Sequence, residues 1–237
     1  MKVGRRDVAV ENKALLLLTA KPSMKRRLIE DSTRLGAALL QRLESSSKCV
    51  NVIARIPRDP FALTSKLPGH DVTIELRAEA ELPAFTRAIT GAGSDLPSAS
   101  ADPAATVVLV GTDHWFRPCP PQAVRFQYLM RRRPDLTHEA FARHYREVHS
   151  EFGYKTWGVQ GYAQLHVDPD ASAEAVRLSG LGTCDFDGVS QLYMPTLTKF
   201  LLASPMNGAR GMIKDEKRFV DRGNSIMFTS RVVATLR

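Results

Sequence analysis

Apolar and polar positions alternate along the first half of the chain in a way that predicts four strands and two helices. Leu28, Leu35, Leu39 and Leu43 recur at helical spacing, which predicts an amphipathic helix with one buried stripe. Around it, short runs with a period of two predict strands. In chain order we expect a strand at 13–20, a helix at 24–43, strands at 50–56 and 71–78, a helix at 82–90 and a strand at 106–116.

The second half repeats this order. We expect a strand at 124–130, a helix at 137–152, strands at 162–167 and 188–194, a helix at 196–203 and a strand at 225–233, with a helical insertion between 205 and 219. Each half therefore reads βαββαβ, the ferredoxin-like order of an α+β fold. The prolines of residues 118–121 mark the expected boundary, which gives units 1–120 and 121–237.

The most informative segment is the helix predicted after the turn at 131–134. Thr137 opens it, and Phe141, Tyr145 and His149 follow at steps of four, which stacks them on one flank. Two later motifs accompany this helix: Asp187-Gly188-Val189 at the start of a strand, and Asp215-Glu216 followed by Phe219-Val220-Asp221.

Together these motifs resemble the EthD family, whose members belong to the dimeric α/β-barrel superfamily. In that superfamily two ferredoxin-like units put their bare sheet faces together and enclose a cavity. The resemblance therefore implies an intramolecular pseudo-dimer packed sheet to sheet, because both units lie in one chain. The alternative is two independent units that each pair with another molecule's copy, and a homodimer is compatible with either arrangement.

Strand alternation indicates which side chains face the cavity. In 162–167 the apolar positions suit the helix side, so we expect Tyr162, Gln164 and His166 on the cavity side. The same rule puts two further sets on one face each: Arg125, Gln127 and Leu129, and Val189, Gln191 and Tyr193. Tyr128 belongs to the opposite face of its strand, but its hydroxyl keeps it among the candidate substrate-binding residues.

His149, His166 and Tyr145 are the candidate catalytic residues. An imidazole has an unperturbed pKa near 6.5, which suits proton transfer at neutral pH. His144 lies five positions before His149, roughly 140° around an α-helix, so the two are not expected to share a ligand. Many EthD-like chains have Trp where this one has Tyr145. His114, at the end of the first unit's last strand, and Asp215, as a residue that orients a histidine, complete the candidates. Apart from His114, we expect the site on the second unit alone, with the first unit as a lid and packing partner.

Composition narrows the function classes. The net charge of +8 comes from basic residues spread along the chain without interleaved aromatics, so no nucleic-acid partner is expected. No apolar run approaches the roughly 20 residues that span a bilayer, and three scattered cysteines favour a reducing compartment over a disulfide or zinc framework. We expect a soluble, cytoplasmic protein with no bound metal or cofactor. Hydrolase, zinc-protease, P-loop and Rossmann motifs are absent from the sequence.

The resemblance implies an enzyme that acts on a small hydrophobic or aromatic substrate. We expect a lyase or dehydratase, or a related cyclase or isomerase, acting on an aromatic or polyketide-like compound by histidine acid–base chemistry. Other superfamily members are cofactor-free oxygenases or bind haem through a histidine. A cofactor-free oxygenase is therefore one alternative, and a non-catalytic binding or accessory protein is the other.

Overall fold

The computed structural model describes residues 9–61, 67, 69–203 and 209–237. Its first half contains the six expected elements and two short additional helices. These are β1 (Ala9–Leu18), α1 (Lys25–Arg42), β2 (Lys48–Arg55), β3 (Val72–Ala78), α2 (Leu82–Ala88), α3 (Ala92–Asp95), a 3₁₀ turn at Pro103–Ala105 and β4 (Val107–Arg117).

The second half follows the same order with more helices. It consists of β5 (Val124–Met130), α4 (His138–His144), the π-helix η2 (Tyr145–His149), α5 (Ser150–Tyr154), β6 (Gly161–Val167), α6 (Pro169–Ser179), β7 (Gly188–Met194), α7 (Leu197–Ala203), α8 (Ala209–Phe219) and β8 (Ile226–Leu236). No helix in the described part of the chain is long and apolar enough to cross a membrane.

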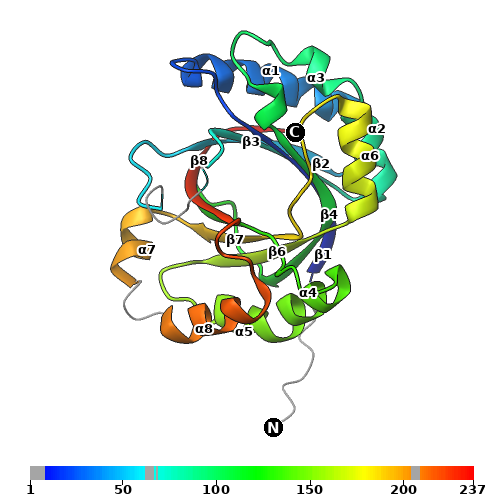
Figure 1. Cartoon of the computed structure of the whole chain (residues 1–237). Helices are drawn as coiled ribbons and strands as arrows, with labels where there is room; N and C mark the ends of the chain where they lie inside the picture. Colours follow the sequence, from blue (N-terminus) through cyan, green and yellow to red (C-terminus); the bar gives the residue numbers. More distant parts are fainter. Residues whose placement is uncertain (1–8, 62–66, 68, 204–208) are drawn as a thin grey trace.

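The eight strands form one closed barrel in the order β1-β3-β2-β8-β5-β7-β6-β4. Each half contributes four adjacent antiparallel strands, and the halves join at two seams, β2 with β8 and β4 with β6. The helices lie outside the barrel, α1, α2, α3 and α6 over one side and α4, α5, α7 and α8 over the other (Figure 1). The expected α+β pseudo-dimer is therefore confirmed. The division into units 1–120 and 121–237 stays a prediction, because both seams are continuous hydrogen-bonded sheet.

The last strand extends beyond the predicted 225–233. Its end pairs with β2, where Leu236 lies opposite Val50. The sequence of 234–237 alone does not contain this information, because the pairing partner is almost 190 positions away.

The sequence analysis missed α6. Its local signals are nevertheless complete: the Asp168 side chain accepts a hydrogen bond from the Ala171 amide at 2.8 Å, Pro169 occupies the first turn, and Gly180 ends the helix at a φ of 71°. Although α6 follows β6, it packs on β4, where the Ser172 hydroxyl bonds the backbone of Val110. The second half thus covers part of the first half's outer face.

The barrel interior is divided along its length. One end is filled by a buried apolar cluster from both halves, which includes Leu15, Leu17, Leu109, Leu129, Leu165, Val189 and Phe228. Toward the other end, the inward positions of the same strands are polar or charged. This division follows from the strand period of two, because Lys13 and Leu15 share a face but lie at different heights.

Candidate functional site

The helix that carries the EthD-like motif begins as predicted but is not one α-helix. Thr137 caps it, accepting a hydrogen bond from the Ala140 amide at 3.2 Å. After His144 the backbone widens into the π-helical turn Tyr145–His149 before α5 continues. A π-turn changes which residues share a face, and such turns are frequent at functional sites.

Asp215 of α8 contacts both histidines of this segment. One carboxylate oxygen lies 3.0 Å from His144 Nε2 and the other lies 3.0 Å from His149 Nδ1. The expected offset of 140° between these histidines is wrong, because it assumed an unbroken α-helix and the π-turn brings positions five apart to the same side. Asp215 was expected to orient a histidine, and it contacts His149 and His144 in the structure.

The facing predicted for β6 is also wrong. Tyr162, Gln164 and His166 lie on the outer face of the sheet, beneath η2 and α5, whereas Ala163 and Leu165 face the barrel interior. The alternation was right, but its assignment to the two faces was reversed. Both faces of this sheet are covered, so polarity alone does not distinguish the interior from the helix layer.

Tyr145 joins these residues into one cluster. Its ring stacks on His166 at 5.0 Å between centroids and lies 6.0 Å from the ring of His149. The three candidate catalytic residues are therefore neighbours, outside the barrel rather than in its cavity. Tyr128 lies on the same outer face in the apolar cluster with Phe126 and Phe141.

Gln164 fixes the tautomer of His166. The Gln164 amide group donates to the Tyr145 carbonyl oxygen at 2.9 Å and to the Tyr162 hydroxyl at 2.6 Å, so its Oε1 is the acceptor for His166 Nε2 at 3.0 Å. His166 consequently has its proton on Nε2 and its lone pair on Nδ1. Burial, together with His114 and Arg146, lowers the pKa of His166 to about 3, which keeps the ring neutral.

His114 reaches this cluster from the first half. It pairs with Gln164 across the β4–β6 seam, and its ring lies 4.7 Å from that of His166. Its Nδ1 is buried and has no hydrogen-bond partner among the residues described, and burial lowers the pKa of His114 to about 4. His114, the candidate from the first half, therefore lies in this cluster, where the β4–β6 seam brings it beside His166.

Burial and hydrogen bonding also shift the pKa values of Tyr145 and Asp215. Burial raises the pKa of Tyr145 well above its usual range, so its hydroxyl stays protonated. Burial opposes ionisation of Asp215, but the hydrogen bonds with His149 and His144 lower its pKa overall. At neutral pH the ionised carboxylate of Asp215 is therefore held against two imidazoles.

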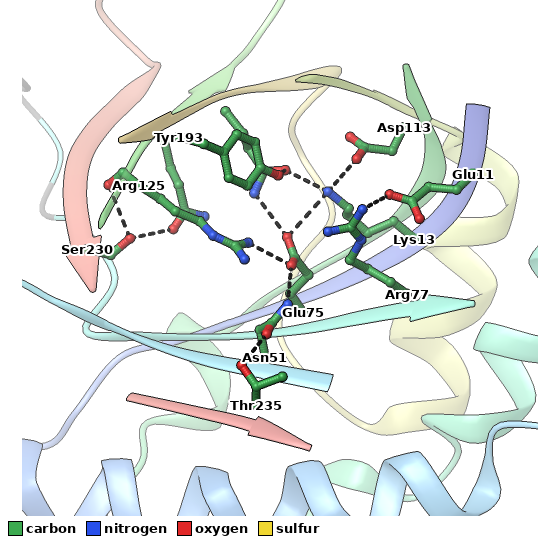
Figure 2. A network of polar contacts seen from close by, with 12 residues as sticks. Glu11, Lys13, Asn51, Glu75, Arg77, Asp113, Arg125, Tyr193, Ser230 and Thr235 are labelled. Carbon is green, nitrogen blue, oxygen red and sulfur yellow. Dashed lines mark hydrogen bonds and ion pairs between the residues drawn. The ribbon is translucent and has the colours of Figure 1, made fainter. Parts of the chain in front are cut away.

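The barrel interior contains the other predicted residues. Arg125, Gln127, Gln191 and Tyr193 face inward as expected. Figure 2 shows Arg125 and Tyr193 at the polar end of the barrel. The Tyr193 hydroxyl donates to Gln191 Oε1 at 3.2 Å, and Arg125 lies over the Tyr193 ring at 4.8 Å. Gln127 Oε1 accepts from the Ser230 hydroxyl at 3.0 Å.

Three fully buried charged residues from the first half were not predicted: Lys13, Glu75 and Asp113. The Lys13 ammonium lies 2.6 Å from Asp113, 3.3 Å from Glu75 and 2.7 Å from Gln191 Oε1. Glu75 also accepts from Arg125 at 2.6 Å. The available signal was the presence of charged residues at inward positions of three neighbouring strands, Glu11 and Lys13, Glu75 and Arg77, and Asp113, because charges in a buried sheet require mutual pairing.

Residues 133–223 match the family model described as the EthD domain, which confirms the resemblance for this segment. No curated protein sequence matches the chain. Among solved structures, an anthrone oxidase-like protein superposes with a TM-score of 0.62 at 12% identity, covering 95% of this chain and 92% of that one. A candidate monooxygenase from Fusobacterium nucleatum subsp. nucleatum gives a TM-score of 0.56 at 8% identity, with 97% and 95% covered. A candidate monooxygenase from Lactobacillus acidophilus gives 0.50 at 10% identity, with 96% and 95% covered.

At these identities the superpositions show a shared fold. Because more than nine-tenths of each chain is covered, the fold in common is the complete single-chain barrel and not one half of it.

Haem bound through a histidine does not fit the residues described. The cavity at the polar end of the barrel has no histidine in its lining. In the outer cluster, the buried ring of His149 packs against Phe152 and Phe219, and the ring of His166 is stacked on Tyr145. An axial ligand needs an imidazole that faces room for the macrocycle. We therefore assign no step to haem.

Proposed function

We propose that this protein is a small-molecule enzyme that performs histidine acid–base chemistry at the outer face of its second sheet, as a lyase or dehydratase of an aromatic or polyketide-like compound. The observation that carries this proposal is the convergence of His149, Tyr145 and His166 from η2 and β6, with Asp215 bonded to His149. Conversion of an unknown substrate is an expectation from the family resemblance and from this geometry together.

The Asp215–His149 pair supplies the base. With Nδ1 of His149 donating its proton to the carboxylate, the lone pair of the neutral ring lies on Nε2. An ionised carboxylate stabilises the imidazolium that forms when Nε2 takes a proton, as in other Asp–His pairs. The pair thus favours abstraction of a proton from carbon next to an activating carbonyl or phenol.

Tyr145 and His166 supply complementary groups. A tyrosine whose pKa is raised keeps its proton and can donate a hydrogen bond to a developing enolate oxygen. The neutral His166 offers Nδ1 as an acceptor for a substrate hydroxyl. After proton abstraction, the electron pair of the broken C–H bond forms the new double bond and the hydroxide leaving group departs as water with the proton returned from His149.

A cofactor-free oxygenase is the second candidate, because neighbouring structures are named anthrone oxidase-like and monooxygenase. The first step would be the same deprotonation. The two candidates differ in the fate of the carbanion, since an oxygenase transfers its electrons to O₂ and a lyase needs no oxidant.

The test is a screen of phenolic and polyketide-like compounds by mass spectrometry, with and without O₂. Loss of water independent of O₂ supports the lyase, and gain of oxygen with O₂ consumption supports the oxygenase. On a converted compound, His149→Ala and His166→Ala should lower turnover by about 10²- to 10⁴-fold. His70→Asn is the control, because His70 lies in the first half beside Thr19 and outside the cluster.

Unchanged turnover in both variants would reject the histidine mechanism. Binding of a compound without conversion, detected as a thermal shift, would instead favour a binding or accessory protein. Either result can be read only if circular dichroism shows that the variants are folded.

A further inference from the structure

We propose that the polar end of the barrel is a second binding site, separate from the histidine cluster, for a planar aromatic anion such as an aryl carboxylate. The juxtaposition that assigns it is the stacked pair Trp115 and Tyr193, each covered by an arginine, at the wall of a cavity of about 1100 Å³. That volume is slightly larger than the roughly 300–1,000 Å³ of most small-molecule sites.

The cavity is open at one end and closed at the other. Its rim includes the exposed residues Val10, Pro118 and Pro120, so a ligand enters from solvent. Its inner lining includes Asn51, Arg77 and Arg125. The fully buried Lys13 and Glu75 lie behind these residues, between the cavity and the apolar cluster that fills the rest of the barrel. A bound molecule would therefore rest on charged groups and not pass through.

The aromatic wall is held rigidly. The Trp115 and Tyr193 rings lie 4.7 Å apart at 33°, and the Trp115 indole donates to Glu11 at 2.7 Å. The guanidinium of Arg77 lies 4.9 Å from the Trp115 ring, and that of Arg125 lies 4.8 Å from the Tyr193 ring. Aromatic faces with fixed orientation favour a flat ligand, because stacking then costs little conformational entropy.

Arg125 provides the polar half of the recognition. Its side chain lines the cavity and is 95% buried, and one Nη donates to Glu75 at 2.6 Å. Its Nε is buried and has no acceptor among the described residues. A buried cationic donor without an acceptor is unfavourable, and a carboxylate oxygen is its strongest complement.

The experiment compares a named acid with its uncharged ester. 1-Hydroxy-2-naphthoate and its methyl ester are titrated into the full chain by calorimetry, and fluorescence is followed in Trp157→Phe, which leaves Trp115 as the remaining indole. We expect one site per chain for the acid, quenching of Trp115, and at least about 10-fold weaker binding of the ester, because a charge-assisted hydrogen bond is lost.

Arg125→Lys keeps the positive charge beside Glu75 but removes Nε, and should weaken binding of the acid by about 10-fold or more. Arg77→Gln, at the partly exposed rim, is a second variant if the first does not fold. His149→Ala and His166→Ala should leave this affinity unchanged. A failure of the catalytic proposal can therefore be distinguished from a failure of the binding-site proposal. Equal affinity for acid and ester, no saturable binding of the acid, or acid binding that the foldable arginine variant does not weaken would overturn the proposal.

Discussion

His149 Nδ1 lies 3.0 Å from a carboxylate oxygen of Asp215, although 66 positions of sequence separate the two residues. Both side chains are buried, and the contact attaches α8 to the π-turn. The packing of α8 therefore depends on the π-turn Tyr145–His149, which positions His149 for this contact.

Asp215→Asn should lower the free energy of unfolding by about 1–3 kcal/mol at pH 7, because two imidazoles lose a charged acceptor. The pKa of Asp215 is lowered in the folded state, so its contribution is present above the unfolded pKa near 3.9 and is lost as pH falls through the lower folded value. Urea denaturation of wild type and variant should therefore converge toward pH 3. An equal deficit at pH 7 and pH 3 would show that the carboxylate charge is not the cause.

Stability should fall as pH is lowered from about 6.5 to 4. Burial lowers the pKa of His70 and His114 to about 4 and that of His166 to about 3, so the unfolded chain binds more protons in this range. Each histidine contributes up to about 1.4 kcal/mol per pH unit. Urea denaturation at several pH values gives the free energy of unfolding as a function of pH. For His114→Gln and His166→Gln this free energy should fall less steeply with decreasing pH than for wild type. Slopes identical to wild type would mean that these rings are not held neutral.

Lys13→Met should lower the free energy of unfolding by about 3–5 kcal/mol, because the buried carboxylate of Asp113 then lacks its cation. Adding Asp113→Leu should recover a large part of this loss, since a buried ion pair can be replaced by apolar side chains. The measurement is a double-mutant cycle by urea denaturation. The control pair is Arg26 and Glu30, whose exposed side chains should couple by no more than about 0.5 kcal/mol. Additive effects of Lys13→Met and Asp113→Leu would exclude a direct interaction.

Gly111→Ala should open the β4–β6 seam. A Cβ at this position would lie 2.1 Å from the His166 carbonyl oxygen, a backbone atom that cannot move without breaking strand pairing. We expect a loss of several kcal/mol, comparable to overpacking of a core at about 1–3 kcal/mol or more. Gly211→Ala in α8 is the matched control, because its new Cβ would approach Phe152 no closer than 3.5 Å. Thermal melting of the two variants distinguishes them, and equal melting temperatures would contradict the steric argument.

The sequence was sufficient for the order of the elements because period and turn chemistry are local properties. It was insufficient for the side of the sheet on which a residue lies. Gln164 is fully buried on the helix side and Gln191 is fully buried in the barrel, yet both are glutamines in alternating strands. Only the pairing of β6 between β4 and β7 determines which face is which.

The sequence predicted which residues form the candidate site better than it predicted how they are arranged. Tyr145, His149 and His166 do gather, because a helix packs on the strand that comes after it. The π-turn was not predictable, since helical spacing assumes one residue every 100°. Lys13 and Asp113 were overlooked because they lie 100 positions apart and become neighbours only when β1 pairs with β4.

The two seams have a consequence for how this barrel assembles. Barrels built from two separate chains exist only above a protein concentration set by their dissociation constant, whereas here β2 meets β8 and β4 meets β6 within one molecule. The tether of residues 118–123 makes the second half permanently available to the first, so folding is unimolecular and does not weaken on dilution. It also releases the halves from twofold symmetry. A charge such as Lys13 can arise once, on one side of the barrel, without an identical copy facing it.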